Sequence, residues 1–250
     1  MRAISLPSEK TGAAPMQSRL PRYFFPALSV FMLAIVIAGF WPSYFGPLVR
    51  EGSVLRPLVI HFHGAVYMGW MALLLLQVAL AATGRVREHR KVGDWGILYG
   101  WMVFGVGLIV TFAAPIIHVR AGEWDVERAA SFLPIPLGDM ILFGGFFALA
   151  MRYRRQPEIH KRLILMATVA LLFAAAGRMS AFIPFPLALA IWLSPILVGI
   201  GFDVVSHRRI HPVYWIGGLV FLIGLLRIPF GQPSLWMTIG RAVIHALAVL

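Results

Sequence analysis

The chain has 250 residues, of which 60% are hydrophobic and only 13% are charged, and its formal net charge is +12. This proportion of charged side chains is too low to cover the surface of a soluble domain of this length. The composition therefore excludes a soluble globular protein and predicts one all-α integral membrane domain. The lack of cysteine excludes disulfides, iron–sulfur clusters, thiolate metal sites and covalently attached c-type haem.

Residues 1–22 are polar and basic, and they lack the short apolar core and small-residue cleavage site of a signal peptide. We therefore predict a cytoplasmic polar tail over 1–22 and a retained first helix after it. A helix that crosses the hydrocarbon core needs about 20 mainly apolar residues. Seven stretches qualify, at residues 23–42, 57–82, 95–117, 133–151, 161–182, 185–204 and 212–229. The sequence thus predicts a seven-helix transmembrane domain over 23–230.

The last stretch, residues 231–250, differs from the seven spans. A helix from Ser234 to Leu250 would be about 25 Å long, which is marginal for a span. One polar stripe would run along it, made of Ser234, Thr238, Arg241 and His245. We predict a C-terminal amphipathic helix on the outer surface, and an eighth span packed into the bundle is the alternative.

The basic residues between the spans are unevenly divided between the two sides of the membrane. Fifteen lie in the tail and in the loops after the second, fourth and sixth spans: Arg2, Lys10, Arg19, Arg22, Arg85, Arg87, Arg90, Lys91, Arg152, Arg154, Arg155, Lys161, Arg162, Arg208 and Arg209. Four lie on the opposite side: Arg50, Arg56, Arg120 and Arg128. Because cytoplasmic loops are enriched in Lys and Arg, we predict a multi-pass inner-membrane protein with a cytoplasmic N-terminus. The charge then favours membrane lipids as partners and no nucleic acid.

Ionisable residues inside apolar spans are costly and usually mark functional sites or structural anchors. Six fall in the outer half of the predicted bundle, from five different spans: His61, His63, His118, Asp139, Arg178 and Arg227. His61 and His63 differ by about 200° of rotation on a regular helix, so they cannot easily chelate one metal ion. Arg178 and Asp139 are alternatively a buried ion pair that fixes two helices.

Polar and small residues also form stripes along three of the spans. On the second span the stripe recurs every seven residues, as His63, Trp70 and Gln77. On the third it is made of Gly100, Gly107, Thr111 and His118, and on the fifth of His160, Ala167, Ala174 and Arg178. The stripes predict an inward face that carries His63, His118 and Arg178. Four other histidines lie beside Arg or Lys at the cytoplasmic boundary and are predicted to be interfacial: His89, His160, His207 and His211.

Three motifs resemble those of an uncharacterised family of bacterial multi-span membrane proteins. They are the HxHG motif His61-Phe62-His63-Gly64, the HR motif His89-Arg90 and the HKR motif His160-Lys161-Arg162. The resemblance extends from the second to the seventh span. It implies the multi-span architecture and a role for the interfacial histidines, and it implies no particular activity.

The leading hypothesis from these residues is a cofactor in the outer half of the bundle. Neutral imidazoles of His61, His63 and His118 would ligate the iron of haem b or a divalent metal. Arg178 or Arg227 would then balance haem propionates or a substrate anion. This hypothesis predicts a coloured or metal-containing protein.

Two alternatives need no haem. In one, the chain is a non-catalytic subunit of a larger membrane complex, or it binds lipid, quinone or pigment. In the other, it is an intramembrane zinc hydrolase, in which His61, His63 and His118 hold the metal. Asp139 would then be a further ligand or the general base. Enzymatic activity is therefore left undecided by the sequence.

Overall fold

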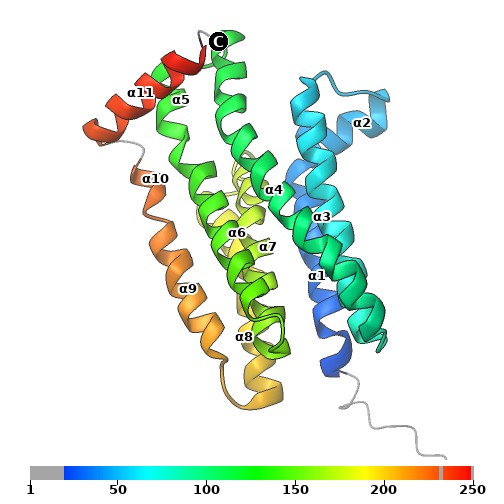
Figure 1. The fold of residues 1–250 in the computed structure, drawn as a ribbon. Coiled ribbons are helices and arrows are strands. Elements are labelled where there is room, and N and C mark those ends of the chain that lie inside the picture. The colour runs from blue at the N-terminus through cyan, green and yellow to red at the C-terminus, as the bar shows by residue number, and fades with distance from the viewer. Residues whose placement is uncertain (1–19, 231–232, 249–250) are drawn as a thin grey trace, which may run out of the picture.

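The computed structural model describes residues 20–230 and 233–248, which form helices joined by short turns (Figure 1). The helices are α1 (Leu20–Phe40), the π-helix η2 (Trp41–Phe45), α2 (Gly46–Glu51), α3 (Leu58–Ala82), α4 (Val86–Arg120), α5 (Val126–Phe132), α6 (Pro134–Arg152), α7 (Pro157–Met179), α8 (Phe185–His207), α9 (Pro212–Gly224), α10 (Arg227–Phe230) and α11 (Ser234–Ala248). These residues contain no strand. Most of the predicted cytoplasmic tail, including Arg2, Lys10 and Arg19, lies outside the described residues.

Seven segments of the described chain are long and apolar enough to cross a membrane, which confirms the predicted count. The first joins α1, η2 and α2 as Arg22–Glu51, and the fourth joins α5 and α6 as Val126–Arg152. The third span also begins earlier than predicted, because α4 begins at Val86 rather than near residue 95. The basic stretch that follows the α3–α4 turn is helical, although it is too polar to lie in hydrocarbon. The chain is thus an all-α integral membrane protein.

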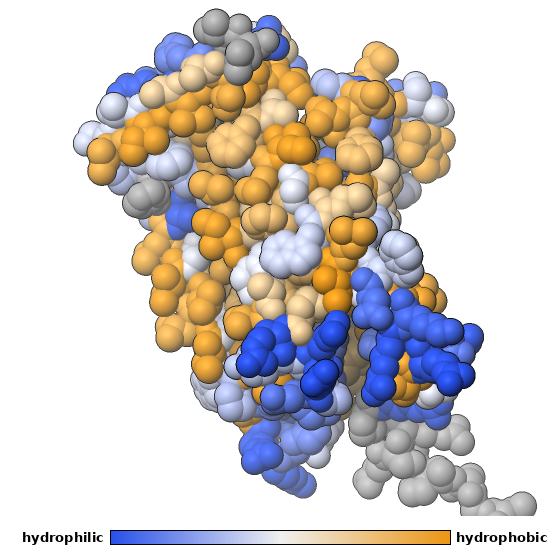
Figure 2. All heavy atoms as spheres, in the orientation of Figure 1, coloured by the Kyte–Doolittle hydropathy of each residue, from blue (hydrophilic) through white to orange (hydrophobic). Residues whose placement is uncertain are grey.

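The C-terminal helix α11 does not cross the bundle but lies across its end, beside α5 (Figure 1). Its Trp236 indole donates to the Ala130 carbonyl at 2.9 Å, and Arg241 pairs with Glu127. This confirms the predicted C-terminal helix, which is not among the seven described segments long and apolar enough to cross a membrane. At the opposite end, hydrophilic residues gather around the α3–α4 and α6–α7 turns, while hydrophobic residues cover the middle of the visible face (Figure 2).

The helix α7 is the centre of the bundle and packs against α1, α6, α8 and α9. Most of its side chains are buried, and several of these are alanines, including Ala167, Ala170 and Ala175. Small side chains allow neighbouring helix backbones to approach closely, which is a main source of packing energy in a membrane. Because α7 is largely buried between these helices, the positions of most of its side chains are set by its neighbours.

The closest approach in this packing is at Gly39 of α1, where any Cβ would collide with the backbone carbonyl of Ala175. The Gly39→Ala variant is therefore expected to lower the free energy of unfolding by about 1–3 kcal/mol, because two backbones must separate. Gly177→Ala is the matched control, since a Cβ at Gly177 meets nothing within 4 Å. That control is expected to be neutral or up to about 1 kcal/mol more stable. Thermal unfolding in detergent measures both, and equal effects would contradict the prediction.

Candidate functional site

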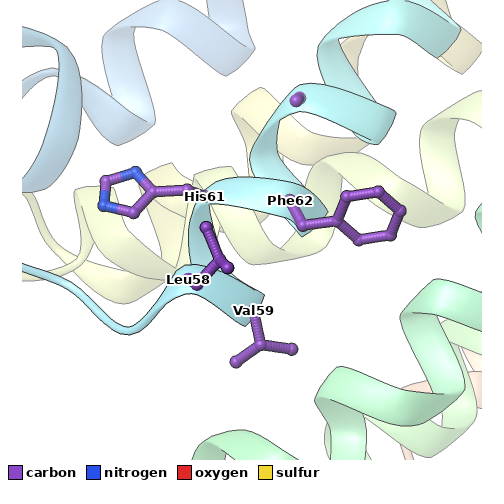
Figure 3. Close-up of a pocket in the computed structure, with 5 residues that line it drawn as sticks. Leu58, Val59, His61 and Phe62 are labelled. Carbon is purple, nitrogen blue, oxygen red and sulfur yellow. The ribbon is translucent and has the colours of Figure 1, made fainter.

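The outer-half residues predicted as a site do not converge. His61 is engaged by Tyr44, whose hydroxyl lies 2.7 Å from the His61 Nδ1 atom. Beside it lies a shallow apolar hollow on α3, lined also by Leu58, Val59 and Phe62, with the His61 and Phe62 side chains pointing in different directions (Figure 3). This hollow offers a ligand no polar partner other than His61.

His118 is held by the turn that follows α4. Its Nδ1 atom lies 2.5 Å from the Glu123 carboxylate, and its ring stacks on Trp124 with centroids 4.4 Å apart. The side chain therefore fastens the end of α4 to the next turn instead of facing His63. The predicted inward face does not include it.

The predicted ion pair between Arg178 and Asp139 is wrong, because Asp139 pairs with Arg227. Arg227 reaches Asp139 across Gly138, a position where any Cβ would collide with the arginine side chain. Arg178 instead donates to the Ala174 carbonyl at 3.0 Å and lies over the Phe40 ring. Arg227 is thus a structural partner and is not free to balance a cofactor carboxylate.

His63 has a buried ring nitrogen that no described hydrogen bond engages. Its Nδ1 atom is buried without a hydrogen-bond partner, and its ring lies 4.1 Å from that of Tyr67, centroid to centroid. Within residues 20–230 and 233–248, no three His, Asp or Glu side chains are grouped so that they could hold a metal ion. The predicted metal set of His61, His63, His118 and Asp139 is therefore not brought together.

A cavity larger than the hollow beside His61 lies at the other end of the bundle, between the α3–α4 hairpin, α1, α6 and α7. This cavity has a volume of about 820 Å³. Its inner wall is apolar and partly aromatic, formed by Phe25, Leu28, Met32, Trp70, Leu74 and Phe147. The Trp70 indole donates to the Thr168 hydroxyl of α7 at 3.3 Å. The stripe of Trp70 and Gln77 predicted from the sequence thus faces inward, where it lines this cavity.

Cationic side chains surround the same cavity where it meets the polar end of the bundle: Arg22, Arg90, Arg154, Arg155 and Lys161. One carboxylate, Asp94, lies among them, 3.7 Å from Arg154. Lys161 is paired with Glu158 at 2.7 Å, whereas Arg90 and Arg155 form no ion pair with a described residue. The cavity therefore combines an apolar interior with a strongly positive rim.

Two half-buried histidines, His89 and His160, also line the cavity. The His160 Nδ1 atom donates to the Ala150 carbonyl at 2.9 Å, and the His89 Nδ1 atom lies 3.2 Å from the Gln77 carbonyl. Both were predicted to be interfacial, because they lie beside basic residues in the sequence. The structure shows that the prediction missed the internal space behind them, which five separate segments of chain create.

A buried charge network fixes the helices next to the cavity. Arg162 and Asp203 form an ion pair and are 2% and 1% exposed. The Arg162 guanidinium also pairs with Glu158 at 2.7 Å and lies over the Tyr214 ring. Counting Arg162 as a loop residue missed this role. The one sequence signal that could have indicated it is Asp203, a carboxylate near the end of an apolar span.

His211 joins this network to the start of α9. Its backbone N–H donates to the Asp203 carboxylate at 3.1 Å, and its ring Nδ1 accepts from the Val213 N–H at 3.2 Å. Burial and the nearby Arg162 guanidinium hold the pKa of His211 below its usual value. A protonated ring would lose the lone pair that caps α9, so the folded chain favours the neutral form.

This cap predicts a pH-dependent stability. Below about pH 6.5, His211 becomes protonated in the unfolded chain, whereas in the folded chain it stays neutral until the pH reaches its lowered pKa. The wild type therefore loses stability as the pH falls from about 6.5 to the folded pKa of His211. His211→Asn keeps a capping oxygen but does not titrate, so its unfolding free energy relative to wild type is expected to rise over that window. His211→Ala is expected to lose about 1 kcal/mol above that window. A pH-independent difference between wild type and His211→Asn in detergent unfolding would contradict this assignment.

Comparison with protein-family models, with curated proteins and with solved structures found no match for this chain. The function proposed below therefore rests on the residues and the geometry of the cavity.

Proposed function

We propose that this polytopic membrane protein binds an anionic amphiphile in the cavity at its basic end. The observation that carries the proposal is the division of the cavity between an apolar interior and a cationic rim. An apolar chain or ring system would fill the interior, and the acidic head would meet Arg90 and Arg155. Of the functions that the sequence leaves open, this corresponds to the lipid-, quinone- or pigment-binding alternative.

The size and the chemistry of the cavity both support this proposal. A volume of about 820 Å³ falls in the range of ligand-binding pockets, roughly 300–1,000 Å³. Burying an apolar ligand against Trp70, Met32 and Phe147 would contribute about 25 cal/mol for each Å² removed from water. Arginine without a carboxylate partner suits phosphate or carboxylate, which it can bind through two parallel hydrogen bonds.

The proposal includes an orientation in the membrane. With the basic loops cytoplasmic, as the positive-inside rule favours, the cavity would open toward the cytoplasmic leaflet of the inner membrane. That leaflet carries anionic lipid, so an acidic amphiphile could enter from the bilayer without crossing water. Reaction of cysteines introduced at Arg90 and at Glu123 with a membrane-impermeant thiol reagent tests this sidedness. The position at Arg90 should react only after the membrane is opened.

The direct test is lipid binding by the purified full chain in detergent. Native mass spectrometry would compare phosphatidylglycerol with phosphatidylcholine of the same acyl chains. The wild type is expected to prefer phosphatidylglycerol, and Arg90→Gln combined with Arg155→Gln is expected to weaken that binding about tenfold, or about 1.4 kcal/mol. The matched control is Arg208→Gln with Arg209→Gln, which removes two charges from the same end of the bundle but not from the cavity. Equal binding of both lipids, or equal losses in both double variants, would overturn the proposal.

A second candidate function is the leading sequence hypothesis, a cofactor in the outer half of the bundle. The buried, unpartnered Nδ1 atom of His63 supports it, because an imidazole in that state is available to a metal or haem iron. An absorption spectrum and metal analysis of wild type and His63→Ala test it. A colourless, metal-free wild type that is fully folded would contradict it.

A place in a larger complex is a further proposal, tested by co-purification from native membranes.

A further inference from the structure

Two helical hairpins that line the cavity carry the same histidine arrangement. In α3–α4 and in α6–α7, the fourth residue of the second helix is a histidine, His89 and His160. The Nδ1 edge of each ring lies against a backbone carbonyl of the preceding helix, that of Gln77 and of Ala150. The arrangement is thus repeated in sequence and in space, although the two hairpins share little else.

This arrangement orients both rings and leaves the same atom of each for a ligand. A histidine that binds a metal typically has its other ring nitrogen held by a carbonyl or carboxylate, which fixes the ring plane. Nδ1 is engaged in both rings, by Ala150 in His160 and by Gln77 in His89, which leaves Nε2 of each as the atom for a ligand. Both rings line the same cavity. Because they come from α4 and α7, a ligand between them would bridge two helices.

The space between them suits a flat apolar ring. On the face of α4 that carries His89, the next two turns present Gly93 and Gly96, where only side chains of α3 lie within 4 Å of an added Cβ. The α3–α4 hairpin is not among the elements that pack closely on α7 in the described part of the chain. Trp70 and Phe147 form an aromatic wall. Arg90 and Arg155 supply positive charge at the rim for two carboxylates.

We propose that the cavity binds a b-type haem with His89 and His160 as the two axial ligands of its iron and with its propionates toward Arg90 and Arg155. This inference rests on the proposed function, because haem is itself an anionic amphiphile. Bis-imidazole ligation needs no cysteine, which the chain lacks. Neither axial ligand of this site belongs to the cofactor site predicted in the outer half of the bundle, where the ligands are His61, His63 and His118.

The test is the absorption and electron paramagnetic resonance spectra of the full chain, purified from cells supplied with a haem precursor. The wild type is expected to hold about one haem b per chain, identified as its pyridine complex, in the low-spin state of two imidazole ligands. His89→Ala and His160→Ala should each give high-spin iron or lose haem, and the double variant should lose it. His89→Met and His160→Met should keep haem with an altered low-spin signal. His245→Ala on α11 is the control and should match the wild type.

Three results would overturn the inference. One is a wild type without haem that also takes up none on titration. A second is haem retained by the double alanine variant and lost from His63→Ala, which would place it in the outer half. The third is a spectrum that none of the histidine variants changes. The proposed function is judged separately: a haem-free wild type that prefers phosphatidylglycerol retains it, whereas one that binds neither haem nor anionic lipid loses both.

Discussion

Replacing Asp203 by leucine is expected to lower the free energy of unfolding by up to about 3–5 kcal/mol, because the buried Arg162 guanidinium then keeps only the exposed Glu158 carboxylate as a partner among the described residues. Asp203 is the acceptor that joins α7 to α8, and it also accepts from the His211 backbone N–H. Loss of this carboxylate therefore removes the buried partner of Arg162 and the acceptor of a half-buried amide. Thermal unfolding in detergent measures the effect.

The matched double variant separates the cost of an unpaired charge from the value of the pair. Arg162→Met with Asp203→Leu is expected to recover much of the lost stability, since the buried guanidinium that lost its buried partner is then removed as well. Glu88→Leu is the surface control, because its pair with Arg85 is exposed and is expected to contribute less than about 1 kcal/mol. A double variant as unstable as Asp203→Leu alone would show that packing, and not charge, dominates here.

Replacing Asp139 by leucine is expected to be similarly severe, at about 3–5 kcal/mol, because Arg227 then loses its only carboxylate within the described residues. Asp139 and Arg227 are 5% and 9% exposed, and the pair joins α6 to the short helix α10. The buried Arg227 Nε atom already has no hydrogen-bond partner, so loss of the Asp139 carboxylate would leave a second part of the guanidinium unsatisfied. The measurement is again unfolding in detergent, with a helical circular dichroism signal as the check on folding.

A double-mutant cycle decides which arginine is coupled to Asp139. Arg227→Met is expected to offset most of the cost of Asp139→Leu, whereas Arg178→Met is expected to add its own small effect without coupling. Arg178 lies over Phe40 and donates to a backbone carbonyl, contacts that do not involve Asp139. Coupling of Asp139 to Arg178 instead would restore the ion pair predicted from the sequence and contradict the structural one.

The residues that were correctly predicted are those whose position depends on their immediate neighbours in the chain. The seven spans follow from runs of apolar side chains, and the C-terminal helix follows from its polar stripe of Ser234, Thr238, Arg241 and His245. Trp70 and Gln77 face inward, as their seven-residue spacing indicates. Each of these predictions uses only helix periodicity and the free energy of transfer to hydrocarbon, and both are local properties.

Which polar groups meet was decided by the tertiary structure. The sequence offers Asp139 two possible arginine partners at a similar predicted depth in the membrane, Arg178 and Arg227. The structure pairs Asp139 with Arg227, whose side chain passes close to Gly138. Arg162 sits in a basic loop pattern, yet α8 brings Asp203 to it across 41 positions of the chain. His89 and His160 look interfacial because the cavity behind them exists only between packed helices.

The basic end of this membrane bundle shows which features follow from the sequence and which follow from the tertiary structure. The sequence by itself determined the all-α membrane fold, the number of spans and the side on which the basic residues gather, because hydropathy and charge add up along a short stretch. Only the tertiary structure decided that these basic residues border an apolar cavity and that two histidines face into it. Those features depend on the rotation and separation of helices far apart in the chain, which no local sum of transfer energies contains.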